Sequence, residues 1–165
     1  MGPELSWVEG SWPGKLAVTP RPRGGDWLQD EVSSWKRAGV SVVLSLLTPQ
    51  EELEFDLGDE AAEVRNLGLK FLSLPIPDRH VPSSETKFAE VLEQTNSALS
   101  KGKNVLVHCR QGVGRSGLVA ACLLIKNGMS SSAAIDAVSA ARGVAVPETR
   151  EQRDWIEHYS PALTK

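Results

Sequence analysis

The sequence predicts a single α/β domain over residues 1–165, with a mostly parallel central sheet of about four or five strands flanked by helices. Two observations carry this prediction. Apolar, β-branched runs such as Val40–Leu46 and Val105–Val107 have the composition of buried parallel strands. Segments with helical spacing of apolar residues, such as Glu85–Leu99, alternate with these runs.

The first part of the chain is predicted to hold one strand, then a helix, then a second strand. We expect residues 1–14 to be a loosely ordered segment before a strand at Leu16–Thr19. A break rich in Pro and Gly follows, and Asp26 has a side chain suited to a helix N-cap. Gly39 is placed to end this helix before the strand at Val40–Leu46.

An acidic stretch comes next. Glu51–Glu63 contains seven carboxylates and neither Lys nor Arg. Paired carboxylates could indicate a metal or glycosidase site. We expect instead the solvated face of short helices around Leu53, Leu57 and Val64.

The second part of the chain is predicted to continue the alternation of strands and helices. The expected elements are a strand at Lys70–Pro75, an extended loop at Ile76–Pro82, helices at Glu85–Leu99, Leu118–Ile125 and Ser130–Arg142, and a last helix opened by Pro147 whose inner face carries Gln152, Trp155, Ile156 and Tyr159. In parallel sheets, ligands bind beyond the carboxyl ends of the strands. Asp78 and Cys109 each follow a predicted strand, so we expect both at the same sheet edge.

Composition excludes several classes of function. The net charge of -3 and the pI near 5.7 disfavour nucleic-acid binding. Two cysteines, Cys109 and Cys122, cannot build a disulfide framework, and the chain does not cluster enough Cys and His for zinc. No apolar run reaches the length of a membrane helix, and Met1–Gly10 lacks the features of a signal peptide. We expect a cytoplasmic protein with no membrane association and no metal or organic cofactor.

The stretch after the strand at Val105–Val107 is typical of an anion site. A glycine-punctuated loop leads from Cys109 to Arg115 and opens a helix. Unpaired backbone N–H groups and the positive end of the helix dipole converge at such a junction. The pattern Gly112-x-Gly114-x-x-Gly117 also matches a dinucleotide fingerprint, but that fold needs a strand after the helix, whereas helices follow here. A Gly-Lys-Ser/Thr motif, which a P-loop nucleotide site needs, is absent from the sequence.

The residue types of the loop indicate phosphoryl transfer. A helix N-terminus and a nearby arginine favour the thiolate of Cys109, which is the effective nucleophile. Arg115 can hold two phosphate oxygens at once, and Ser116 can donate a hydrogen bond to the sulfur. The phosphate would bind the backbone of the residues between them, namely Arg110, Gln111, Gly112, Val113 and Gly114.

His108-Cys-Arg-Gln-Gly-Val-Gly-Arg-Ser116 resembles the Cys-x5-Arg signature of the protein tyrosine phosphatase superfamily. The size resembles its compact dual-specificity branch, which includes the cyclin-dependent-kinase-inhibitor-associated and Cdc14-like phosphatases. Asp78, in Leu74-Pro-Ile-Pro-Asp78, matches the general acid of that family. The resemblance implies a phosphatase for phosphotyrosine, and for phosphoserine or phosphothreonine, that works through a phosphocysteine intermediate. It also implies that phosphate and other oxyanions inhibit at the loop.

Other residues receive supporting roles. His108 is expected to orient the loop, and Gln152 matches the second Gln of a family motif whose first position is Glu148 here. Cys122 is expected in the core. Arg79 and His80 border Asp78, while Arg21 and Arg23 either rim the pocket or are solvated. Two alternatives stay open: a phosphatase for phosphoinositides or nucleotides, and a non-catalytic phospho-binding module.

Overall fold

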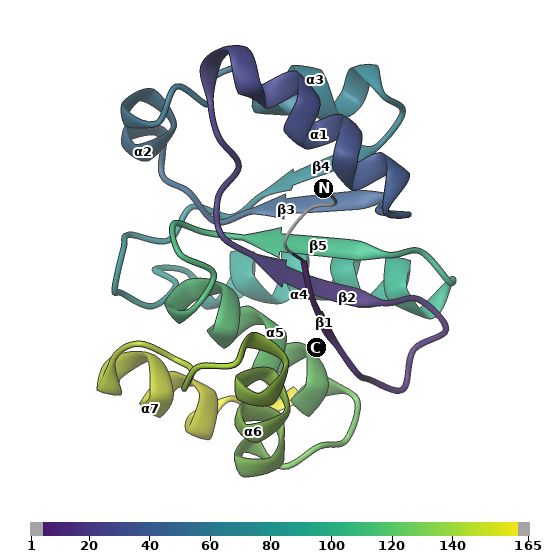
Figure 1. Cartoon of the computed structure of the whole chain (residues 1–165). Coiled ribbons are helices and arrows are strands. Elements are labelled where there is room, and N and C mark those ends of the chain that lie inside the picture. Colours follow the sequence, from purple (N-terminus) through teal and green to yellow (C-terminus); the bar gives the residue numbers. More distant parts are fainter. Residues whose placement is uncertain (1–4, 162–165) are drawn as a thin grey trace.

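A computed structural model describes residues 5–161 of the chain, and these form a five-stranded sheet with helices on both faces (Figure 1). The strand order is β1-β2-β5-β3-β4, in which β1 is antiparallel to β2 and the other neighbours are parallel. The strands are β1 (Ser6–Val8), β2 (Leu16–Thr19), β3 (Val42–Ser45), β4 (Lys70–Ser73) and β5 (Val105–His108). The predicted single α/β domain with a mostly parallel sheet is confirmed.

The side chains of the central strand alternate between two hydrophobic cores. Val105 and Val107 of β5 pack in one core, and Leu106 between them packs in the other. The first core lies under α4, α5 and α6, and the second lies under α1 and α3 (Figure 1). The helices are α1 (Leu28–Arg37), α2 (Pro49–Glu54), α3 (Glu60–Asn66), α4 (Glu85–Ser100), α5 (Gly114–Lys126), α6 (Ser131–Arg142) and α7 (Arg150–His158), with a short 3-10 turn, η1 (Gly25–Trp27), before α1.

The parallel order brings the predicted site residues together. Both β4 and β5 pair with β3 in the same direction, so the loops that follow them leave the sheet at one edge. Asp78 lies in the loop after β4, and Cys109 directly follows β5. The prediction that both residues lie at this edge is confirmed.

Helix starts agree with the sequence in some places and not in others. Ser84 and Ser130 cap α4 and α6 through their side chains. The predicted cap at Asp26 is wrong, because Asp26 lies inside the turn η1 and α1 begins one residue after it ends. The prediction that Pro147 opens the last helix is also wrong. Thr149 caps α7 and forms a capping box with Gln152.

The edge strand β1 was not predicted from the sequence. Its three residues are too few to show a periodic pattern, and it pairs Ser6 with Val18 of β2. Val8 and Trp12 are buried in the first core. This corrects the expected loose segment for residues 5–14, while residues 1–4 lie outside the described residues. Between residues 5 and 161, no helix has the length and apolar character needed to cross a membrane.

Candidate active site

The Cys109–Arg115 loop curls around the sulfur of Cys109. The backbone N–H of Gly112 donates a hydrogen bond to Cys109 Sγ at 3.3 Å. Gly112 has a φ of 71°, in the left-handed region that favours glycine. A Cβ atom there would lie 2.7 Å from the carbonyl carbon of Thr19, so the loop also packs too closely against the end of β2 for a side chain.

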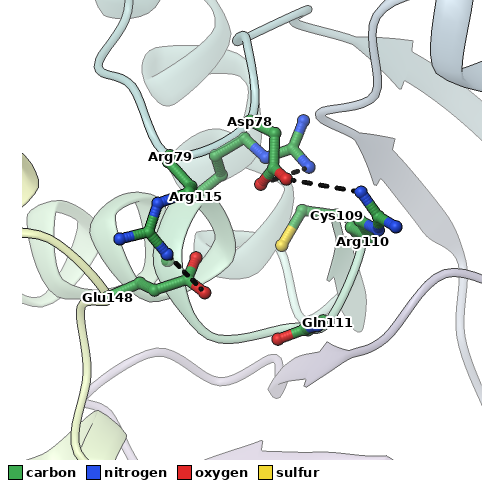
Figure 2. Close-up of a pocket in the computed structure, with 8 residues that line it drawn as sticks. Asp78, Arg79, Cys109, Arg110, Gln111, Arg115 and Glu148 are labelled. Atoms are coloured by element: carbon green, nitrogen blue, oxygen red, sulfur yellow. Dashed lines mark hydrogen bonds and ion pairs between the residues drawn. The ribbon is translucent and has the colours of Figure 1, made fainter.

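A cavity of about 260 Å³ opens above this loop (Figure 2). Its lining consists of Asp78, Arg79, Cys109, Arg110, Gln111, Gly114, Arg115 and Glu148. Six of these eight residues were predicted from the sequence as site residues. The other two are Arg79, which was expected to border Asp78, and Glu148. Cys109 is only 2% exposed, so its thiol is accessible from the cavity and hardly from elsewhere.

Arg115 is buried and held by a network of acceptors. Its Nη1 and Nη2 atoms donate to the two carboxylate oxygens of Glu51 at 2.7 and 2.9 Å. Nη1 also donates to the carbonyl of Ile76 at 2.8 Å, and Nη2 donates to Asp78 Oδ1 at 3.2 Å. Since Nη1 faces Glu51 and Ile76, Nη2 is the donor on the side of Asp78 and the cavity.

Glu51 is in turn fixed by the start of α2. Thr48 and Glu51 form a capping box, in which each accepts a hydrogen bond from the backbone of the other. Burial alone would raise the pKa of Glu51, but the hydrogen bonds from Arg115 and Thr48 outweigh burial and hold this pKa below its usual value. Burial would lower the pKa of Arg115, and Glu51 overcomes that effect to raise it.

His108 lies behind the loop and not in the cavity. Its Nε2 atom is 2.5 Å from Glu60 Oε2, and both side chains are fully buried. The ring also lies beside Trp35, with centroids 5.9 Å apart. This position agrees with the orienting role that we expected for His108.

The structure corrects the expectation for the acidic stretch. Glu51 and Glu60 were predicted to lie on a solvated face, but both are buried against the site, one on Arg115 and the other on His108. A buried carboxylate needs a paired cation or donor, and each of these two has one. Within residues 5–161, no group of three or more His, Cys, Asp or Glu side chains could hold a metal ion.

Asp78 reaches into the cavity between two arginines, as Figure 2 shows. Besides its bond to Arg115, its Oδ2 atom lies 3.7 Å from Arg110 Nη1. The loop that carries Asp78 is held both by α7 and by the residues just before it. Arg79 Nη1 lies 3.3 Å from Glu148 Oε2, and Gln152 Nε2 donates to the carbonyl of His80 at 3.0 Å.

Gln152 is buried, as predicted, but it does not line the cavity. Its Oε1 atom accepts from the backbone N–H groups of Glu148 and Thr149. Both ends of the amide are therefore committed to backbone groups, which makes Gln152 a support for the loop of Asp78. The cavity is lined by Glu148 instead.

The expected hydrogen bond from Ser116 to the sulfur is not found. The hydroxyl of Ser116 is buried without a hydrogen-bond partner among the described residues, and the backbone of Gly112 contacts Sγ instead. Val113 precedes the first residue of α5 and does not line the cavity. Cys122 is fully buried in the core, as expected, and burial raises the pKa of its thiol.

Sequence reasoning missed Arg142, the last residue of α6. Its Nε atom donates to the carbonyl of Gly112 at 2.8 Å, and its Nη2 atom donates to that of Gln111 at 3.1 Å. The peptide between these two residues thus has its carbonyl on Arg142 and its N–H on Cys109 Sγ. An arginine at a helix C-terminus is usual in any sequence, so no local signal pointed to this contact.

The chain is similar in sequence to known phosphatase domains. The model of a family described as Swiss Army Knife protein, DSP-PTPase phosphatase domain (PTP-SAK), matches residues 3–157. Cyclin-dependent kinase inhibitor 3 of Rattus norvegicus is 28% identical over 138 residues, which cover 82% of this chain. The chain spans 65% of the length of that relative.

Solved structures show the same fold. The structure of kinase-associated phosphatase matches with a TM-score of 0.83 at 22% identity, over 94% of this chain and 93% of that one. The structure of Tk-PTP in its active form matches with a TM-score of 0.74 at 29% identity, over 95% and 98% of the two chains. The dual-specificity-phosphatase-like fold predicted from the sequence is confirmed.

Replacing Glu51 by Gln is expected to destabilise the protein by about 2–4 kcal/mol at neutral pH, because the buried Arg115 loses its charged partner. The lowered pKa of Glu51 means that its contribution is present above its usual pKa and is lost as the pH falls below that value. Urea unfolding should therefore show that, between neutral pH and pH about 3, the free energy of unfolding falls more for the wild type than for Glu51→Gln. Glu54→Gln, on the exposed side of α2, is the matched control. Equal stability of the two variants at neutral pH would contradict the role of this ion pair.

Proposed function

The chain belongs to the Swiss Army Knife family of DSP-PTPase phosphatase domains, and we propose that it dephosphorylates phosphoproteins through a phosphocysteine intermediate. Phosphotyrosine is the expected substrate, with phosphoserine and phosphothreonine also accepted. The observation that carries the proposal is the cavity in which Cys109, Arg115 and Asp78 meet. We propose that residues 1–165 form one such domain, that it acts in the cytoplasm, and that it needs no metal or organic cofactor.

In the first step, Cys109 Sγ attacks the phosphorus atom in line with the leaving oxygen. The S–P bond forms as the P–O bond breaks, and Asp78 transfers its proton to the leaving oxygen. The backbone N–H groups of the Cys109–Arg115 loop and Nη2 of Arg115 stabilise the charge on the other phosphate oxygens. A phosphate oxygen on Nη2 takes the place that Asp78 Oδ1 holds in this structure.

In the second step, water attacks the phosphocysteine. The O–P bond forms as the S–P bond breaks, the proton of the water moves to Asp78, and the thiolate returns with the release of inorganic phosphate. Gln152 does not line the cavity, and both ends of its amide are bound to backbone groups. It therefore acts in this step by holding the loop of Asp78 and not by contacting the water. The side chain at the cavity wall is the carboxylate of Glu148, which is held by Arg79.

Cys109→Ser should abolish turnover of p-nitrophenyl phosphate, because a hydroxyl is a far weaker nucleophile than a thiolate. The wild type should lose no activity with a chelator present, and acid quenching should trap a phosphorylated protein only when Cys109 is intact. Cys122→Ser is the matched control, since that thiol is buried in the core away from the cavity. Full activity of Cys109→Ser would remove Cys109 from the reaction.

Asp78→Ala should lower kcat by roughly 10²- to 10³-fold, the usual contribution of a general acid. The loss should be larger for phosphate esters with poor leaving groups, which depend most on protonation, than for p-nitrophenyl phosphate. KM should change little. A loss of the same size for every leaving group would show that Asp78 shapes the site without donating a proton.

Arg142→Gln should lower kcat/KM by roughly tenfold, because the carbonyls of Gln111 and Gly112 lose the donor that keeps the loop N–H groups turned inward. Inhibition by vanadate should weaken in parallel, which a general loss of stability would not cause at a temperature where the variant is folded. Ser6→Ala removes only the remaining hydrogen bond of Arg142 and serves as the control. Unchanged vanadate inhibition would contradict the positioning role of Arg142.

A further inference from the structure

Two arginines, Arg21 and Arg110, each lie over the aromatic ring of Phe55. The guanidinium carbon of Arg21 is 3.9 Å from the centroid of the Phe55 ring, and that of Arg110 is 5.3 Å from it. Arg110 lines the cavity, whereas Arg21 comes from the segment after β2. The half-buried Phe55 ring thus contacts two guanidinium groups, one of which belongs to a residue that lines the cavity.

Backbone contacts hold this arrangement in place. The N–H of Arg21 donates to the carbonyl of Arg110 at 3.3 Å, which joins the segment after β2 to the Cys109–Arg115 loop. The N–H of Gly25 donates to the carbonyl of Asp56 at 3.0 Å, next to Phe55. The main-chain segments that carry the two arginines and the ring are therefore joined to one another beside the cavity.

The charges of these arginines are poorly compensated. Arg21 forms no salt bridge with a carboxylate of residues 5–161, and its side chain donates to the carbonyl of Pro22. Arg110 has Asp78 at 3.7 Å, and that carboxylate is neutral whenever it carries the proton needed for the first step. Arg23, two residues after Arg21, is already paired with Glu31. An anion that reaches both guanidinium groups would offset their positive charge.

We propose that Arg21 and Arg110 form a second anion subsite, which binds an acidic side chain of the phosphopeptide close to the phosphorylated residue. The inference rests on the proposed function. The acidic group is a carboxylate or a second phosphate, since a guanidinium holds either one through two parallel hydrogen bonds. The exposed Glu54 and Asp56 beside Phe55 would repel an anionic membrane, whereas a peptide can present a single acidic group to the arginines.

The test compares kcat/KM for one phosphotyrosine peptide in three forms, with Glu, phosphoserine or Gln at positions one or two residues from the phosphotyrosine. The wild type should prefer the acidic forms to the Gln form by roughly three- to tenfold at low salt, the effect of one charged hydrogen-bonded contact that is partly exposed. Added salt should reduce this ratio. The form with the larger ratio identifies the preferred group as a carboxylate or a phosphate.

Two matched variants assign the effect to Arg21. In Arg21→Gln the ratio should fall towards one, and in Arg21→Lys it should fall part of the way, because the charge stays but the planar fork is lost. Arg23→Gln removes the same charge from the same segment and should keep the ratio. The ratio compares two substrates for each variant, so a general loss of folded protein cancels.

Three outcomes would overturn the inference. The wild type could hydrolyse all three peptides equally, or Arg21→Gln and Arg23→Gln could lower the ratio by the same factor. A phosphoinositide in anionic vesicles could also be hydrolysed faster than every peptide with the same dependence on Arg21, which would assign the subsite to lipid. Failure of the wild type to hydrolyse any phosphopeptide or p-nitrophenyl phosphate would instead overturn the proposed function.

Discussion

The buried ion pair between Arg115 and Glu51 is the contact on which the arrangement of the site depends. A guanidinium that is 1% exposed has lost its water, and several kcal/mol of solvation must be replaced by close anionic and carbonyl partners. Glu51 provides both carboxylate oxygens, and the carbonyl of Ile76 provides a further acceptor. The side chain of Arg115 thereby joins the start of α5, the start of α2 and the loop of Asp78. These three segments are separated in sequence, and the hydrogen bonds of Arg115 bring them together.

The Cys109–Arg115 loop is shaped from its outer side. Its inner surface must offer backbone N–H groups, and each peptide that turns its N–H inward turns its carbonyl outward, where it needs a donor. Arg142 supplies that donor for Gln111 and Gly112, and the N–H of Gly112 then reaches Cys109 Sγ. The closeness of Gly112 to the end of β2 sets the same loop against the sheet. The edge strand β1, which contacts Arg142 through Ser6, therefore takes part in positioning the sulfur.

What could be predicted from the sequence is what depends on local pattern. The buried strands, most helices and the junction from Cys109 to Arg115 follow from apolar spacing and from glycine placement, and the parallel order then puts Asp78 beside Cys109. The roles of Glu51 and Glu60 could not be predicted, because their partners lie 64 and 48 residues away and nothing in the sequence distinguishes them from the other carboxylates of Glu51–Glu63. Arg142 lies 30 residues from Gly112 and was missed for the same reason. The helix starts predicted at Asp26 and Pro147 failed for local reasons, since Asp26 lies inside a 3-10 turn and Thr149 caps the last helix after Pro147.

Asp78 connects substrate binding with acid catalysis in the proposed reaction. Its carboxylate accepts a hydrogen bond from Nη2 of Arg115 and lies close to Arg110. It therefore occupies donors that a bound phosphate needs. A phosphate dianion in the cavity and an ionised Asp78 repel each other, whereas a protonated Asp78 leaves both arginines to the substrate. The proton that makes Asp78 an acid is therefore the same proton that releases the binding groups. Arg79 and Gln152 hold the loop of Asp78 from the side of α7 through contacts that do not involve the carboxyl group, so the loop keeps its place when that group gives up Arg115 to the substrate.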